Sequence, residues 1–137
     1  CLIWVNWRGF SGGTRDMYDS VLKYGSMILD GLRKYNQPVY SYLAPGAELR
    51  GGAMVVMSSG VNPNIRMWAD PDARIGVLEA SGVYEIKFKK RMPNIPVRDA
   101  VRAIDLYDHP SECDIMSICK LTELRDRIIN DHTGHAD

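Results

Sequence analysis

The chain has 137 residues, of which 45% are apolar and 25% are charged, a composition typical of one globular domain. Its 17 Lys and Arg balance 17 Asp and Glu, so the positive field expected of a nucleic-acid-binding protein is missing. The apolar runs are shorter than the roughly 20 residues that a membrane-spanning helix needs. We therefore expect a cytoplasmic protein with no nucleic-acid partner and no membrane-spanning segment. A strand-like run starts directly after Cys1, which suggests a piece of a longer polypeptide.

The chain has three cysteines, an odd number without the pair spacing of a metal site: Cys1, Cys113 and Cys119. Such a sparse set predicts a reducing compartment. A zinc site would have to combine them with His109, His132 and His135. Because no CxxC pair is present, we expect no bound metal.

The first third of the chain predicts a strand, a glycine-rich turn and a helix. A β-rich run over residues 2–7 ends in the turn at 8–13, and a helical pattern over about 14–34 follows. Its apolar residues recur at helical spacing, so we expect one broad buried face that includes Val21, Ile28 and Leu32.

The same arrangement is repeated in the next segment. A strand over 39–43 is followed by the glycine pair Gly51 and Gly52, which opens an apolar, helix-compatible run. Amides at the start of each helix would then point at whatever lies above the strand ends. Two further short strands are expected at 65–69 and 75–78.

The later part of the chain is predicted to be largely helical. Residues 83–88 fit either a strand or a helix face, whereas 97–106 and 115–129 have amphipathic helical patterns. Residues 131–137 are polar and terminal, and we expect them to be disordered.

Several segments together resemble one known family. NWRGFSGG at residues 6–13, ELRGG at 48–52 and YEIKF at 84–88 closely resemble the carboxyltransferase domain of eukaryotic acetyl-CoA carboxylase. The similarity runs in order over about residues 2–90, which makes it far more specific than any single glycine pair. It implies an α/β, crotonase-like fold of ββα units, present as a partial carboxyltransferase domain.

The resemblance also implies a domain organisation and partners. Residues 1–90 look like the C-terminal half of the domain, whereas 91–137 look like a divergent helical segment with a disordered tail. Expected partners are the N-terminal half, a biotin carrier domain and a second subunit in a homodimer. The cofactor would be biotin, carried as carboxybiotin on the separate carrier, and the substrate acetyl-CoA. ATP would be used only in a biotin carboxylase domain that this sequence lacks.

The chemistry of such an enzyme requires fixed hydrogen-bond donors. Negative charge develops on the biotin ureido oxygen and on the thioester oxygen, and each charge needs donors aimed at it. By resemblance, the amides of Gly52 and Ala53 form the biotin-side oxyanion hole. The alternative is that Gly51 and Gly52 merely allow a helix to pack closely on a strand.

Other residues acquire roles from the same resemblance. Arg8 matches an active-site arginine whose planar fork could hold a carboxylate, although a surface ion pair is the alternative. Phe10 would form part of the wall beside the substrate or the biotin ring, with a buried core position as the alternative. The resemblance places Val55 with Phe10, Gly51 and Gly52 among the residues that bind biotin.

Two departures from the family pattern leave a second function open. Met54 stands where the family usually has tryptophan, and Ser58 stands where it usually has aspartate. A working acetyl-CoA carboxylase, making malonyl-CoA for fatty-acid biosynthesis, is the first expectation. The alternatives are a non-catalytic remnant or scaffold, and a carboxylase for propionyl-CoA or another acyl-CoA.

Overall fold

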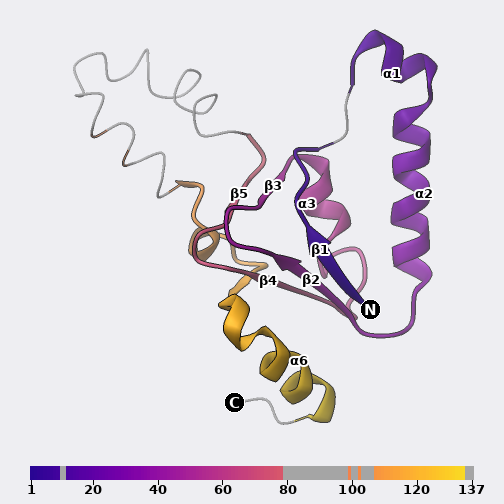
Figure 1. The fold of residues 1–137 in the computed structure, drawn as a ribbon. Helices are drawn as coiled ribbons and strands as arrows, with labels where there is room; N and C mark the ends of the chain where they lie inside the picture. The colour runs from indigo at the N-terminus through magenta and orange to yellow at the C-terminus, as the bar shows by residue number, and fades with distance from the viewer. Residues whose placement is uncertain (10–11, 79–98, 100–101, 103–106, 135–137) are drawn as a thin grey trace.

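The computed structural model describes residues 1–9, 12–78, 99, 102 and 107–134 (Figure 1). The elements of the first half are β1 (Leu2–Val5), α1 (Thr14–Tyr18), α2 (Val21–Lys34), β2 (Val39–Leu43), β3 (Glu48–Arg50), α3 (Gly52–Val56), β4 (Ile65–Ala69) and β5 (Arg74–Gly76). The later part contributes β6 (Ser117–Ile118), α6 (Leu124–Thr133) and two short 3-10 helices, Pro110–Glu112 and Leu121–Glu123. The predictions for 83–88 and for most of 97–106 lie outside the described residues.

A parallel sheet forms the centre of the fold. Its strand order is β1-β2-β4-β6, and every neighbouring pair is parallel. The register aligns Val5 with Leu43, Leu43 with Ala69, and Ala69 with Ile118. β3 and β5 form a second, two-stranded parallel sheet. The predicted strands at 39–43 and 65–69 are confirmed at these bounds. The first strand ends at Val5 instead of residue 7, and the strand expected at 75–78 spans Arg74–Gly76.

Helices cover both faces of the main sheet, and this explains why every residue of β2 is buried. Val39 and Leu43 belong to a core cluster that also holds residues of α3 and partly buried residues of α2. Tyr40 and Tyr42, which alternate with them along the strand, belong to the cluster on the other side with Leu124 of α6. The expected α/β class is therefore confirmed. β2 is buried throughout, whereas Leu2 and Trp4 of the edge strand β1 are exposed.

The segment after residue 115 differs from its prediction. Ser117 and Ile118 pair with the edge of β4, so the helix expected over 115–129 begins only at Leu124. Hydrogen bonding to an available strand edge overrides the helical pattern at this position. The helix continues to Thr133 and ends at Gly134, so the expectation of disorder is wrong for residues 131–133.

Tyr42 provides a test of the packing under α6. Its side chain is fully buried, and its hydroxyl lies 3.2 Å from the carbonyl oxygen of Cys119. Burial, followed by the nearby Asp70 carboxylate, raises the pKa of Tyr42 to about 12. An unfolded tyrosine loses its proton near pH 10.

The unfolding free energy should therefore fall as the pH rises from about 10 to about 12, by on the order of 2 kcal/mol from Tyr42, because the unfolded chain releases the proton first. Tyr42→Phe should remove this part of the fall. The check is denaturant unfolding from about pH 9 to about pH 12 in both proteins. Equal pH slopes would show that the hydroxyl is not held protonated by the fold.

The predicted helix over about 14–34 is interrupted. Ser20 has a left-handed φ of 57°, which separates α1 from α2. Val21 and Leu32 are partly buried, but Ile28 is 42% exposed, so the prediction of its burial is wrong for this chain. The inner side of α2 packs on the first core cluster through Leu29 and Leu32.

A group of large apolar side chains remains exposed on the two helices, which stand along one side of the sheet in Figure 1. We call it the apolar helix surface; it consists of Met17, Tyr18, Leu22, Tyr24, Met27 and Ile28. The exposed fractions range from 42% to 85%. Large apolar side chains exposed in this number make the two helices a candidate protein interaction surface. No helix within the described ranges is long and apolar enough to span a bilayer.

Candidate active site

The two glycine turns that the sequence singled out lie side by side. The Trp7 amide donates to the Glu48 carbonyl at 2.7 Å, and the Arg50 amide donates to the Trp7 carbonyl at 2.8 Å. Gly9 and Gly51 have left-handed φ angles of 101° and 58°, which other residues rarely adopt. A Cβ added to Gly51 would lie 3.9 Å from the Gly9 Cα, so the two backbones approach closely.

Gly52 behaves differently from Gly51. Its φ is not left-handed, and a Cβ added there meets no described atom within 4 Å. Close packing within the described part of the chain therefore gives no reason for glycine at this position. The amides of Gly52 and Ala53 open α3, ahead of the Met54 amide, which donates to the Gly51 carbonyl at 3.2 Å. First-turn amides of a helix lie outside its hydrogen-bond ladder and can donate to another group.

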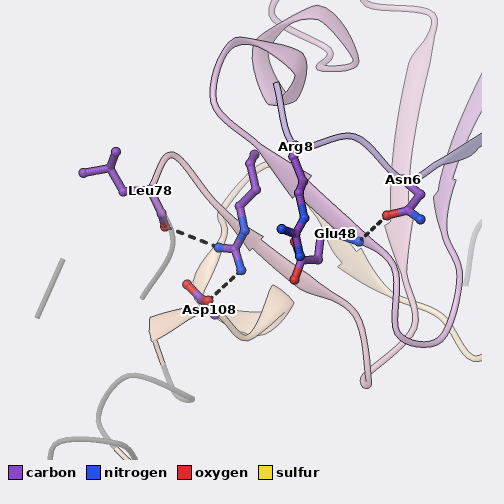
Figure 2. Close-up of polar contacts among 6 residues, drawn as sticks. Asn6, Arg8, Glu48, Leu78 and Asp108 are labelled. Atoms are coloured by element: carbon purple, nitrogen blue, oxygen red, sulfur yellow. Dashed lines mark hydrogen bonds and ion pairs between the residues drawn. The ribbon is translucent and has the colours of Figure 1, made fainter. Parts of the chain in front are cut away.

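Arg8 forms an ion pair at the rim of the turns. Figure 2 shows its side chain next to that of Glu48. The Arg8 Nε lies 2.9 Å from Glu48 Oε2, and the Arg8 side chain is 73% exposed. Asn6 also binds Glu48, the first residue of β3. The Oδ1 atom of Asn6 accepts a hydrogen bond from the Glu48 amide at 3.0 Å. Arg8 thus forms a surface ion pair, which is the alternative considered for it above. A role in holding substrate stays a prediction.

Sequence reasoning missed a buried ion pair behind the second turn. Arg50 Nη2 lies 2.7 Å from Asp108 Oδ2, and the two side chains are 6% and 7% exposed. Arg50 Nη1 also donates to the Leu78 carbonyl at 3.3 Å (Figure 2). The partners are 58 residues apart in the chain, and no local pattern relates them. The one signal in the sequence was a charged residue directly before a glycine pair.

The remaining predicted residues are distributed along α3. Ala53 is buried, whereas Val55 is 57% exposed and available to a ligand or partner. Met54 packs partly against the first core cluster. Ser58, for which the resemblance predicted aspartate, donates a hydrogen bond to the Val55 carbonyl at 2.8 Å. Phe10 lies outside the described residues.

The described residues contain no cluster of three or more His, Cys, Asp or Glu side chains that could hold a metal ion. The three cysteines are free. Burial raises the pKa of the Cys119 thiol, which disfavours the reactive thiolate. The described residues of the turns offer hydrogen bonds from backbone amides and positive charge from arginine.

Comparison with known proteins defines the class. Residues 1–107 match the family model of the carboxyl transferase domain, and the chain belongs to this family. Among its relatives is an acetyl-CoA carboxylase of Dictyostelium discoideum, 55% identical over 89 residues, which are 64% of this chain and 4% of the relative. The mitochondrial acetyl-CoA carboxylase of Saccharomyces cerevisiae strain YJM789 is 48% identical over 109 residues, which are 79% of this chain and 5% of the relative.

The architecture also has a solved counterpart. Transcarboxylase 12S, crystallised with methylmalonyl-coenzyme A and methylmalonic acid, superposes with a TM-score of 0.74. The match covers 93% of this chain and 25% of that chain at 17% identity, and so relates the folds alone. The fold is crotonase-like, as the resemblance implied. The family match extends to residue 107, beyond the 1–90 boundary expected above, and the domain division stays a prediction.

Proposed function

We propose that the chain is the C-terminal half of an acetyl-CoA carboxylase carboxyltransferase. The reaction transfers a carboxyl group from carboxybiotin to acetyl-CoA and gives malonyl-CoA for fatty-acid biosynthesis. The observation that carries the proposal is the pairing of the two glycine turns, with Gly52 open to an approaching group. The 55% identity to an acetyl-CoA carboxylase supports the choice of acetyl-CoA.

The residues present fit the expected group. Biotin supplies a ureido nitrogen that carries the carboxyl group and a ureido oxygen that gains negative charge when the carboxyl leaves. The amides of Gly52 and Ala53 would hold that oxygen, because their donors are outside the helical ladder and no side chain at position 52 blocks the approach. Arg8 lies at the rim of the turns beside Glu48, and its planar guanidinium is the group that would hold a carboxylate there.

The enzyme would need further parts. Carboxybiotin would arrive on a separate carrier domain, and ATP would be used in a biotin carboxylase domain. The thioester would be held by the N-terminal half of a carboxyltransferase, contributed within a homodimer. The apolar helix surface supports this requirement, since it exposes large apolar side chains that a second half would cover. A cytoplasmic location stays a prediction, and the yeast relative is named mitochondrial.

The apolar helix surface should make the isolated chain self-associate. Replacing Leu22 and Met27 together by lysine should shift the chain toward monomer, because both side chains are more than half exposed and their replacement leaves the core intact. Ile129→Lys, at a 50% exposed position on α6, is the matched control. Sedimentation velocity gives the readout; equal association of all three proteins would contradict this assignment of the interface.

A non-catalytic scaffold is the second candidate. Met54 and Ser58 favour it, since both differ from the residues that the resemblance predicts, whereas the intact Arg8, Gly51, Gly52 and Ala53 favour the enzyme. A carboxylase acting on propionyl-CoA or another acyl-CoA is a third reading. All three predict the same fold and differ in the reaction.

Reconstitution separates these functions. The chain is mixed with the N-terminal half of a carboxyltransferase and a carboxylated carrier, and the product is measured with acetyl-CoA and with propionyl-CoA. We expect malonyl-CoA to form in the mixture and not with the chain alone. Faster transfer to propionyl-CoA would favour the third reading, and no transfer from an assembled, folded mixture would favour the scaffold.

A further inference from the structure

The buried pair of Arg50 and Asp108 has no role in the function proposed above. Arg50 Nη2 lies 2.7 Å from Asp108 Oδ2, and the two side chains are 6% and 7% exposed. Burying two charges is often no more stabilising than filling the same space with apolar side chains. Stability alone therefore gives no reason for an ion pair at this position.

The pair joins three separate segments at the start of the second glycine turn. Arg50 Nη1 donates to the Leu78 carbonyl at 3.3 Å, and the Asp108 carbonyl accepts from the Ile75 amide at 2.9 Å. Gly76 leaves room for this arrangement, because a Cβ there would lie 3.0 Å from Arg50 Nη1 and 3.4 Å from Asp108 Oδ1. Asp108 is also the first residue beyond the part that matches the family model.

We propose that Asp108 is a positioning residue for the second glycine turn. It holds the Arg50 guanidinium, and Arg50 is the last residue of β3, directly before Gly51. The Arg50 backbone is fixed in turn by its 2.8 Å hydrogen bond to Trp7. The pair thereby sets the direction in which the chain enters the turn, and with it the direction of the Gly52 and Ala53 amides. The role in transfer rests on the proposed function; the ordering of the turn does not.

Asp108→Asn tests the ordering, because it removes the charge and keeps the shape of the side chain. Hydrogen exchange is followed in the 137-residue chain at the Arg50 and Met54 amides, which bond Trp7 and Gly51. We expect both amides to exchange at least tenfold faster. Asp70→Asn is the matched control: Asp70 is equally buried, but it accepts hydrogen bonds from the amides of residues 72 and 121. Equal acceleration by both variants, or none by Asp108→Asn, would overturn the proposal.

A second variant covers the case in which Asp108→Asn does not fold. Arg50→Met with Asp108→Leu replaces both charges by apolar side chains, which buried sites often accept. We expect this double variant to fold and still to exchange faster at Met54. Protection equal to that of the unaltered chain would overturn the proposal.

Carboxyl transfer in the reconstituted enzyme gives the functional readout. Either Asp108 variant should lower kcat at least tenfold, with the KM for acetyl-CoA unchanged and Asp70→Asn close to the unaltered enzyme. An unchanged kcat would overturn the positioning role. Absence of transfer in the unaltered enzyme would instead refute the proposed function, and the exchange results would still decide whether Asp108 orders the turn.

Discussion

Gly52→Val should lower carboxyl transfer in the reconstituted enzyme by a factor of about a hundred to a thousand, or about 2.7 to 4 kcal/mol, the usual loss for one oxyanion-hole donor. The branched side chain would occupy the space that is open above Gly52 and hinder the approach of the ureido oxygen. ATP-dependent carboxylation of biotin should stay nearly unchanged, because it occurs in another domain.

The two partial reactions are assayed separately, together with the melting temperature of each protein. Gly51→Val is the informative comparison, since Gly51 has a left-handed φ of 58° and should lose stability when a side chain is added. Gly52→Val should lose transfer without that loss. If its transfer declines only in step with unfolding, Gly52 serves packing and not the reaction.

Arg50→Met alone should lower the unfolding free energy by about 3 to 5 kcal/mol, the usual cost of leaving one buried charge without its partner. The Asp108 side chain, which is 7% exposed in the unaltered chain, would be left without its ion-pair partner beside an apolar side chain. Denaturant unfolding of the isolated chain measures the change.

Arg66→Met is the matched control for this loss. Arg66 also pairs with an aspartate, Asp131, at 3.6 Å, but the two side chains are 49% and 33% exposed. An exposed pair of this kind contributes about 0 to 1 kcal/mol. Similar losses in the two variants would show that the burial of the Arg50 pair does not govern its contribution.

The sequence predicted the central strands better than the edge strand β6 and the break between α1 and α2. Residues 39–43 and 65–69 are mainly apolar runs, each with one polar residue, bounded by turn residues, and both form central strands. Ser117 and Ile118 carry no comparable signal, since their conformation depends on the edge of β4. The break at Ser20 is likewise absent from the periodicity, because the apolar residues on both sides of it keep helical spacing.

In the candidate site too, the features set by local sequence could be predicted and those set by distant contacts could not. Its glycine turns could be recognised from local sequence, and the structure places Gly9 and Gly51 against each other. The pairing of Arg50 with Asp108 could not be predicted from local sequence. It depends on where a segment 58 residues away packs against β5. The exposure of Ile28 was missed for a related reason: helical periodicity marks an apolar face but does not say whether this chain or a partner covers it.

The central claim is that position 52 is glycine because a reacting group approaches it. Gly52→Ala tests this most directly, since a single methyl group there meets no described atom within 4 Å and requires no unusual φ. The measurement is the single-turnover rate of carboxyl transfer in the reconstituted enzyme, with the melting temperature of the same protein. We expect the transfer rate to fall at least tenfold while the melting temperature stays the same; an unchanged transfer rate would contradict the claim.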